Sequence, residues 1–295
     1  EDIAHAIAIH PTTGEVYVAG KTYSTNFPGT SGGAQASYRG GLRDAFVARL
    51  NSSLTQILQA TYLGGSGEDS ASALAIYPTR GEVYVAGWTL STDFPRTSGG
   101  AQASRGGSFD ADAFVARLNS NLTQILQATY LGGSRDDFAN ALAIHPTTGE
   151  VYVAGYTVSN DFPGTSGGAQ ANYGAFREAF VARLNSSLTQ ILQATYLGGR
   201  NGGDEANALA ISSTGDVYVA GRTSSNDFPR TSGGAQASYG GSSDAFVARL
   251  NSSLTQILQS TYLGGSGDDF ANALAIHPAT GEVYVAGGTW STNFP

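Results

Sequence analysis

Short runs of β-branched, aromatic and small apolar residues alternate with polar turns along the whole chain. In one representative stretch the four apolar runs are residues 139–144, 150–155, 179–184 and 190–197. Their composition is typical of β-strands, and the turns between them carry Pro, Gly, Asn and Ser. Because no segment keeps a helical period, we predict an all-β chain with four strands in each stretch of this kind.

This four-strand pattern is repeated along the sequence. Phe-Pro pairs begin at Phe27, Phe94, Phe162, Phe228 and Phe294, so that successive pairs lie 66 to 68 residues apart. We therefore treat residues 1–295 as one array with repeats at approximately 1–67, 68–135, 136–202 and 203–267 and a half repeat at 268–295. A residue that recurs in every repeat is expected to serve the repeat unit rather than a single active site.

Several of the predicted strands are apolar on both faces, as in Leu142-Ala-Ile144. A strand with one face in water should alternate strictly, so each small sheet is expected to lie between two others. This favours a β-propeller of four-stranded antiparallel blades, with four complete repeats and a half repeat. The rival β-solenoid has coils of about 20–30 residues. We expect the Ala- and Asn-rich first strand nearest the axis and the fourth strand outermost, with its Tyr62, Tyr130, Tyr196 and Tyr262.

The repeat resembles the SBBP family, a bacterial and archaeal β-propeller repeat. The residues that carry the resemblance are Asp69-Ser-Ala71, Gly81-Glu-Val-Tyr-Val-Ala-Gly-Trp-Thr89, Ser91-Thr-Asp-Phe-Pro95, Asp112-Ala-Phe-Val-Ala-Arg-Leu118 and Ala128-Thr-Tyr-Leu-Gly-Gly133. The resemblance covers every repeat. It implies a propeller fold and a module of large secreted or cell-surface proteins, often beside adhesion-type domains. This chain departs from the pattern in a longer first turn and in Arg where the third strand commonly has Lys.

Charge and composition exclude several classes. The net charge of −8 and pI of about 4.9 disfavour nucleic acid as a partner. The chain has no cysteine, hence no disulfide or thiolate metal site, and no apolar run of the roughly 18–20 residues that span a bilayer. It begins and stops within repeats, so we expect a piece of a longer polypeptide. The half repeat is then truncated, completed by further chain, or completed by a neighbouring molecule.

An acidic residue opens every repeat: Asp2, Asp69, Asp137, Asp204 and Asp269. A ring of carboxylates near a channel mouth could bind Ca²⁺, but we favour a structural role in which each Asp accepts backbone N–H groups of the turn between blades. No other cofactor is expected. A second acidic set, which we expect to pair with the Arg five residues on, precedes the third strand: Asp44, Asp112, Glu178 and Asp244. The turn residues His10, His145 and His277 are expected to be solvated.

Residues that vary between repeats are the candidates for recognition. The position after Gly-Glu-Val-Tyr-Val-Ala-Gly varies most, and with a nearby tryptophan it defines the candidate set Lys21, Trp88, Tyr156, Arg222 and Trp290. The aromatic members could stack on sugar rings, although drift at exposed positions explains the same variation. Glycosylation sequons occur near the turn between the third and fourth strands, at Asn51, Asn121, Asn185 and Asn251.

No symmetry-breaking group of residues forms a nucleophile–base pair, a phosphate loop or a metal-ligand set, so we do not expect an enzyme. The leading hypothesis is a secreted or cell-surface structural or adhesive propeller that self-assembles into a polymer or filament through completion of the half blade. Its partners would be copies of itself or other surface proteins. The alternative hypothesis is a multivalent, lectin-like propeller that binds carbohydrate.

Overall fold

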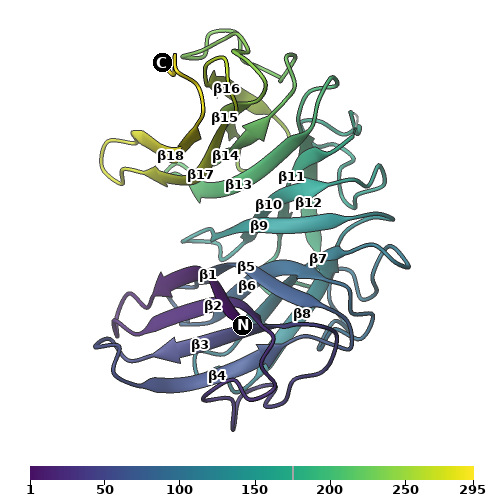
Figure 1. Cartoon of the computed structure of the whole chain (residues 1–295), viewed down its shortest axis with the longest axis vertical. Helices are drawn as coiled ribbons and strands as arrows, with labels where there is room; N and C mark the ends of the chain where they lie inside the picture. Colours follow the sequence, from purple (N-terminus) through teal and green to yellow (C-terminus); the bar gives the residue numbers. More distant parts are fainter. Residues whose placement is uncertain (175) are drawn as a thin grey trace. The chain divides into compact units, whose positions relative to one another are not determined.

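The computed structural model of the chain describes residues 1–174 and 176–295, and in these residues every regular element is a β-strand (Figure 1). The first sheet has the order β1-β2-β3-β4 and consists of β1 (Asp2–Ile9), β2 (Val16–Thr22), β3 (Asp44–Leu50) and β4 (Ile57–Leu63). The second has the order β5-β6-β7-β8 and consists of β5 (Asp69–Ile76), β6 (Val83–Thr89), β7 (Asp112–Leu118) and β8 (Ile125–Leu131).

Two further four-stranded sheets and one two-stranded sheet follow. The third sheet has the order β12-β11-β10-β9 and consists of β9 (Asp137–Ile144), β10 (Val151–Thr157), β11 (Glu178–Leu184) and β12 (Ile191–Leu197). The fourth consists of β13 (Asp204–Ile211), β14 (Val217–Thr223), β15 (Asp244–Leu250) and β16 (Ile257–Leu263). The last contains only β17 (Asp269–Ile276) and β18 (Val283–Thr289), and we call it the half blade.

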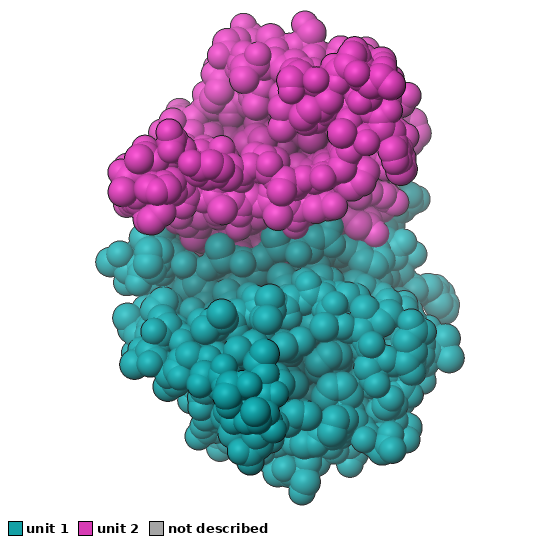
Figure 2. Space-filling view, turned by 60° about the vertical axis from the view of Figure 1, so that its left-hand side comes forward, with its two compact units in different colours: residues 1–151, 184–190 teal, residues 152–183, 191–295 magenta. Residues whose placement is uncertain are grey.

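The chain divides into two compact units, which Figure 2 shows in different colours. The first comprises residues 1–151 and 184–190, and the second comprises residues 152–183 and 191–295. Within the first unit, β1 lies against β5 and β5 against β9; within the second, β13 lies against β17. First strands of successive sheets thus lie side by side, as expected for the strands nearest a propeller axis. The predicted class, all-β with repeated four-stranded antiparallel blades, is confirmed.

Four first hairpins, β1–β2, β5–β6, β13–β14 and β17–β18, have a β-bulge in the same place, where the chain passes very close to its neighbour. In the second sheet the register shifts between Ala71 and Ala73, opposite Gly87. A Cβ atom on Gly87 would lie 1.9 Å from the carbonyl oxygen of Ser70. Only glycine permits this approach, which explains Gly20, Gly87, Gly221 and Gly287 at the end of their Val-Tyr-Val-Ala-Gly segments.

The core lies between sheets, as the apolar faces predicted. In the first unit one cluster joins Tyr17, Ala19, Val47 and Leu63 of the first sheet to residues of the second sheet. These partners, all at most 8% exposed, are Val83, Val85, Phe94, Phe114, Ala116, Leu118, Leu122 and Ile125. One face of a blade therefore packs against the opposite face of the next blade.

The fourth-strand tyrosines anchor the long connection between the second and third strands of their own blade. The Tyr62 hydroxyl donates to the Ser24 carbonyl at 2.8 Å and accepts from the Phe27 N–H at 2.9 Å. The same pair of bonds recurs at Tyr130, Tyr196 and Tyr262. Each of these four tyrosines is at most 1% exposed. The phenylalanine of each preceding Phe-Pro pair therefore fixes its loop to the fourth-strand tyrosine.

One expectation about ion pairs is wrong. Arg49 does not pair with Asp44; its guanidinium pairs with Glu15 at 2.7 Å, and Arg117 and Arg249 pair likewise with Glu82 and Asp216. Five residues of extended strand separate Asp44 from Arg49 by roughly 17 Å. The cross-strand register instead brings Arg49 opposite Tyr17, two residues from Glu15.

Candidate functional site

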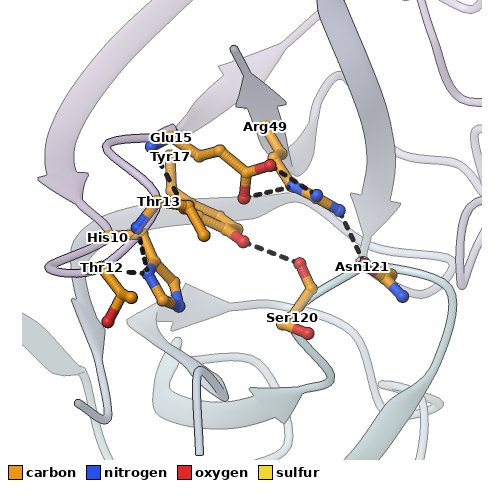
Figure 3. A network of polar contacts seen from close by, with 8 residues as sticks. All are labelled: His10, Thr12, Thr13, Glu15, Tyr17, Arg49, Ser120 and Asn121. Carbon is orange, nitrogen blue, oxygen red and sulfur yellow. Dashed lines mark hydrogen bonds and ion pairs between the residues drawn. The ribbon is translucent and has the colours of Figure 1, made fainter. Parts of the chain in front are cut away.

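A polar joint links successive blades and recurs along the chain (Figure 3). The Tyr17 hydroxyl donates to the Ser120 carbonyl at 2.8 Å, across to the turn between the third and fourth strands of the next blade. Tyr84 reaches Ser186 at 2.7 Å and Tyr152 reaches Ser252 at 2.7 Å in the same way. Burial raises the pKa of the Tyr84 phenol to about 12, so the hydroxyl remains a donor.

A second bond of the joint uses the same turn. The Ala34 N–H donates to the Leu122 carbonyl at 2.9 Å, and the pairs Ala101–Leu188 and Ala169–Leu254 repeat the contact. Each acceptor leucine has a positive φ, between 56° and 60°, and is 0% exposed. A left-handed leucine is uncommon, and at these three positions its side chain is fully buried.

Figure 3 shows that the joint also carries charge. The Arg49 guanidinium forms a two-pronged pair with Glu15, at 2.7 and 3.0 Å, and donates to Asn121 Oδ1 of the next blade at 2.7 Å. His10 Nδ1 accepts from the backbone N–H groups of Thr12 and Thr13, each at 3.3 Å. His10 therefore orders its own turn, as His145 and His277 order theirs.

The joint is unfilled at two places. Leu54, in the first blade, has the same φ of 59° as its counterparts but is 63% exposed, whereas they are fully buried. In the fourth blade, Tyr218 and Ala235 hold the positions of the donor tyrosine and donor amide, and both are more exposed than the donors of earlier blades. A groove of about 280 Å³ is lined by Ala235 together with Val247, Tyr262, Leu263, Val283 and Val285.

Sequence reasoning missed this joint. The tyrosine of Val-Tyr-Val-Ala-Gly looked like an ordinary strand residue, and Ser-Ser-Leu looked like an ordinary turn. The only signal was that leucine recurs at a turn position where a polar residue or glycine is usual. A repeated apolar residue in an otherwise polar turn indicates that something covers it.

The first-strand aspartates are placed in turns between blades. Asp69 is 0% exposed, and its Oδ2 accepts from the Gly65 N–H at 2.9 Å and the Ser91 hydroxyl at 2.8 Å. Asp137, Asp204 and Asp269 accept from the corresponding glycine N–H, and Asp2 accepts from Thr22 and Ser24. In the described part of the chain no three His, Asp or Glu side chains converge as a metal site would require.

A second buried carboxylate, at the start of the third strand, lies near the first-strand aspartate of the following blade, as Asp112 does near Asp137. Asp44 is 0% exposed and accepts from the Arg39 N–H at 2.9 Å. Gly132 separates the corresponding pair, since a Cβ there would lie 2.5 Å from Asp137 Oδ2 and 3.0 Å from Asp112 Cγ. Burial raises the pKa of Asp44 and of Asp112 to about 6 and that of Asp69 and of Asp204 to about 7. These carboxyls take up protons near neutral pH.

Most of the predicted recognition residues already contact neighbouring side chains. The Trp88 ring lies 4.8 Å from the Arg43 guanidinium and 5.5 Å from the Phe138 ring. The Arg177 guanidinium lies 4.4 Å over Tyr156. Arg222 donates to Ser243 and pairs with Asp268 at 3.6 Å. Lys21 is half-buried near the end of β2, and Trp290, beside Phe270, is 74% exposed.

The sequon asparagines have two different positions. Asn51, Asn185 and Asn251 close the turn between third and fourth strands, where each Oδ1 accepts two backbone N–H groups and each Nδ2 donates to a threonine hydroxyl. Asn119 has this role in the second blade. Asn121 lies two residues on and accepts from Arg49 instead. A glycan on Asn51, Asn185 or Asn251 would have to replace the threonine bond.

A cavity of about 630 Å³ lies in the second unit. Its lining includes Gln170, Tyr173, Arg200, Asp227 and Pro229. Asp227 Oδ1 accepts the backbone N–H of Arg200 at 3.0 Å, which holds the cavity wall in place. In residues 1–174 and 176–295 no helix has the length and apolar content needed to cross a bilayer.

Comparison with known proteins supports the fold. Residues 194–229 match the SBBP family, described as Beta-propeller repeat. A protein called Regulatory protein FlaEY, from Caulobacter vibrioides, is 26% identical over 76% of this chain, which spans 24% of that relative's length. A crystal structure of a protein of unknown function from Dyadobacter fermentans has a TM-score of 0.54 at 13% identity, with 97% of this chain and 75% of that chain covered. At this identity the structural likeness concerns the fold alone.

Proposed function

From the β-propeller repeat that residues 194–229 match, we propose that this chain is a non-catalytic structural or adhesive module that works outside the cell or on its surface and assembles through its blade joints. The observation that carries the proposal is the joint itself, which is repeated three times between successive blades. Each joint pairs one face of a blade with a different face of the next, which is a heterologous contact, and heterologous contacts that do not close a ring build open arrays.

The repeated polar groups support a role in assembly rather than in chemistry. The buried carboxylates accept turn N–H groups, the tyrosines hold loops and joints, and the arginines pair across strands. The name of the Caulobacter relative describes that protein as regulatory, which for this chain favours partner binding over catalysis.

The test combines localisation with assembly. Antibodies against the purified chain should label intact cells of the source organism at their surface, and light scattering should show particles that grow with protein concentration. A monodisperse monomer at all concentrations, together with label confined to the cell interior, would contradict the proposal.

A second candidate function is carbohydrate binding, which the exposed Trp290 favours. An indole that is 74% exposed presents an aromatic face on which a sugar ring can stack. A glycan array would test this, with Trp290→Ala expected to abolish binding. Trp88→Ala is the matched control, because the Trp88 ring already contacts Arg43 and Phe138. Binding that survives Trp290→Ala would exclude the stacking role.

A further inference from the structure

The cavity of about 630 Å³ in the second unit is lined by three polar segments of two complete blades. Asn172 belongs to the connection between β10 and β11, Arg200 to the turn between β12 and β13, and Asp227 to the connection between β14 and β15. All three residues are exposed, so the cavity can be entered from solvent. Its volume falls in the range of about 300–1,000 Å³ that is usual for small-molecule sites.

The third repeat departs from the other repeats at this cavity. Asn172 and Arg200 each stand where the other repeats have serine. The serines that correspond to Asn172 are Ser37, Ser104 and Ser238, and those that correspond to Arg200 are Ser66, Ser134 and Ser266. The turn that carries Arg200 is also one residue longer, because its glycine N–H bonds to the aspartate five residues on, rather than four as in the other turns. In an array of near-identical repeats, these changes gather around one cavity.

The change from serine to arginine leaves hydrogen-bonding groups of the cavity wall free. Between the first and second blades, the Ser66 N–H and hydroxyl both donate to Asp93 Oδ1, at 2.8 and 2.9 Å. At the cavity only the Arg200 N–H donates to Asp227 Oδ1, at 3.0 Å. In the part of the chain that the structure describes, the Arg200 guanidinium, the Asn172 amide and Asp227 Oδ2 have no partner. The cavity therefore offers uncommitted donors and acceptors together.

These groups suit a ligand that has many hydroxyl groups and no net charge. Arg200 and Asp227 carry opposite charges, which cancel, and the net charge of −8 on the chain opposes an anionic ligand. A hydroxyl both donates and accepts, so it can accept from the guanidinium or donate to the carboxylate. Tyr173, Pro229 and Ile257 also line the cavity and supply aromatic and apolar surface for the C–H face of a sugar ring.

We propose that this cavity binds a short, uncharged saccharide. The Arg200 guanidinium donates to sugar oxygens, Asp227 Oδ2 accepts from sugar hydroxyls, and the Asn172 amide does both. The site does not include Trp290. It goes beyond the assembling role, because it assigns the chain a ligand whose binding does not require self-association.

A glycan array probed with the purified full chain tests the class of ligand. The array would carry uncharged oligosaccharides of two to four sugars, together with oligosaccharides of galacturonic and glucuronic acid as charged counterparts. At least one uncharged oligosaccharide should bind, and calorimetric titration with that oligosaccharide should give saturable one-to-one binding. Absence of binding, or binding confined to the uronic acid oligosaccharides, would overturn the proposal.

Two substitutions that restore the serine of the other repeats test the site, with circular dichroism to verify the fold. Arg200→Ser removes charge-assisted hydrogen bonds and should weaken binding at least tenfold. Asn172→Ser should weaken binding about threefold to fivefold. Arg230→Gly is the matched control, because Arg230 is exposed, does not line the cavity, and has a φ of 62° that glycine adopts readily. The control should leave the affinity unchanged.

The variants also separate this site from the functions proposed above. A saccharide in the cavity should lose affinity with Arg200→Ser and keep it with Trp290→Ala. The reverse result would overturn the cavity site while retaining carbohydrate binding at Trp290. Equal losses with Arg200→Ser and Arg230→Gly would overturn the cavity site as well. Light scattering without saccharide reports on assembly separately, so a chain that stays monomeric can still support the cavity site.

Discussion

The second blade and the half blade contain nearly the same first hairpin in different surroundings. Both have the same register and the same bulge, between Ala71 and Ala73 and between Ala271 and Ala273. Yet β6 is buried along almost its whole length, whereas β18 is mostly exposed or half-buried. Tyr84 is 0% exposed and its counterpart Tyr284 is 57% exposed. Local sequence builds the hairpin, and the outer strands and the next blade bury it.

The same comparison separates hydrogen bonding from burial at the first-strand aspartate. Asp69 and Asp269 accept the same bonds, from a glycine N–H and a serine hydroxyl. Burial raises the pKa of Asp69 to about 7. At Asp269 burial also opposes ionisation, but the bonds from Ser291, Thr289 and the Gly265 N–H outweigh it and the pKa falls below its ordinary value. The balance between burial and hydrogen bonding therefore shifts the pKa in opposite directions at the two aspartates.

The largest expected difference is in the cost of removing the second-strand tyrosine. Tyr84→Ala deletes a buried ring and its bond to Ser186, and should destabilise the first unit by about 3–5 kcal/mol. Tyr284→Ala removes a ring that is largely in solvent and should cost less than about 1 kcal/mol. Urea unfolding followed by circular dichroism measures both. Equal costs would mean that the two hairpins have equivalent surroundings.

Substitution of the bulge glycine should destabilise the two hairpins by similar amounts. Gly87→Ala places a Cβ 1.9 Å from the Ser70 carbonyl oxygen on the neighbouring strand, and Gly287→Ala places one 1.8 Å from the Phe270 carbonyl oxygen. Each should destabilise its hairpin by about 1–3 kcal/mol, because the clash is with backbone that belongs to the same hairpin. Hydrogen exchange of β5 and β17 amides measures this. Tolerance at Gly287 alone would show that the half blade relaxes.

Stability should fall as the pH rises from 5 to 8. The unfolded-state pKa of Asp is near 4, and the folded-state values are about 6 for Asp44 and Asp112 and about 7 for Asp69 and Asp204. The folded chain binds these protons more tightly, so their contribution is full below about pH 4 and is lost as the pH passes through 6 to 7. Urea midpoints at pH 5 and pH 8 measure the effect.

Two asparagine variants are the controls for this pH dependence. Asp69→Asn should flatten the slope between pH 5 and 8, since a neutral amide no longer titrates. Asp269→Asn should leave that slope unchanged, because the lowered pKa of Asp269 places its titration below this range. A midpoint that rises toward pH 8 would show that the paired carboxyls are ionised without penalty.

The smallest expected effect concerns the arginine of the joint. Arg49→Lys loses the two-pronged pair with Glu15 and the bond to Asn121, and should cost about 1 kcal/mol. Arg249→Lys loses a pair with Asp216 at a side chain that is 46% exposed, and should cost less than about 0.5 kcal/mol. Thermal unfolding of both variants at low and high salt would measure the two losses of stability. A larger loss for Arg249→Lys than for Arg49→Lys would show that the pair with Asp216 is the more stabilising of the two.

Much of the fold follows from the repeat because its signals are local. Alternating apolar runs, Gly and Pro turns and the fixed interval predict the strands, their grouping in fours and the propeller class. The pairing of Arg49 with Glu15 was not predicted, because it depends on cross-strand register rather than on distance along the chain. The joint was not predicted either, since Tyr17 and Ser120 are 103 residues apart.

By itself, the sequence determined the hairpins, the bulge opposite glycines such as Gly87 and Gly287, and the strands of each repeat, since these depend on steric preferences of neighbouring residues. Tertiary structure alone decided which copies of identical segments are buried. Leu54 and Leu254 occupy the same Ser-Ser-Leu-Thr turn with the same φ of 59°, and one is 63% exposed and the other fully buried. Burial depends on what packs against a residue, and the neighbours of these two identical turns differ.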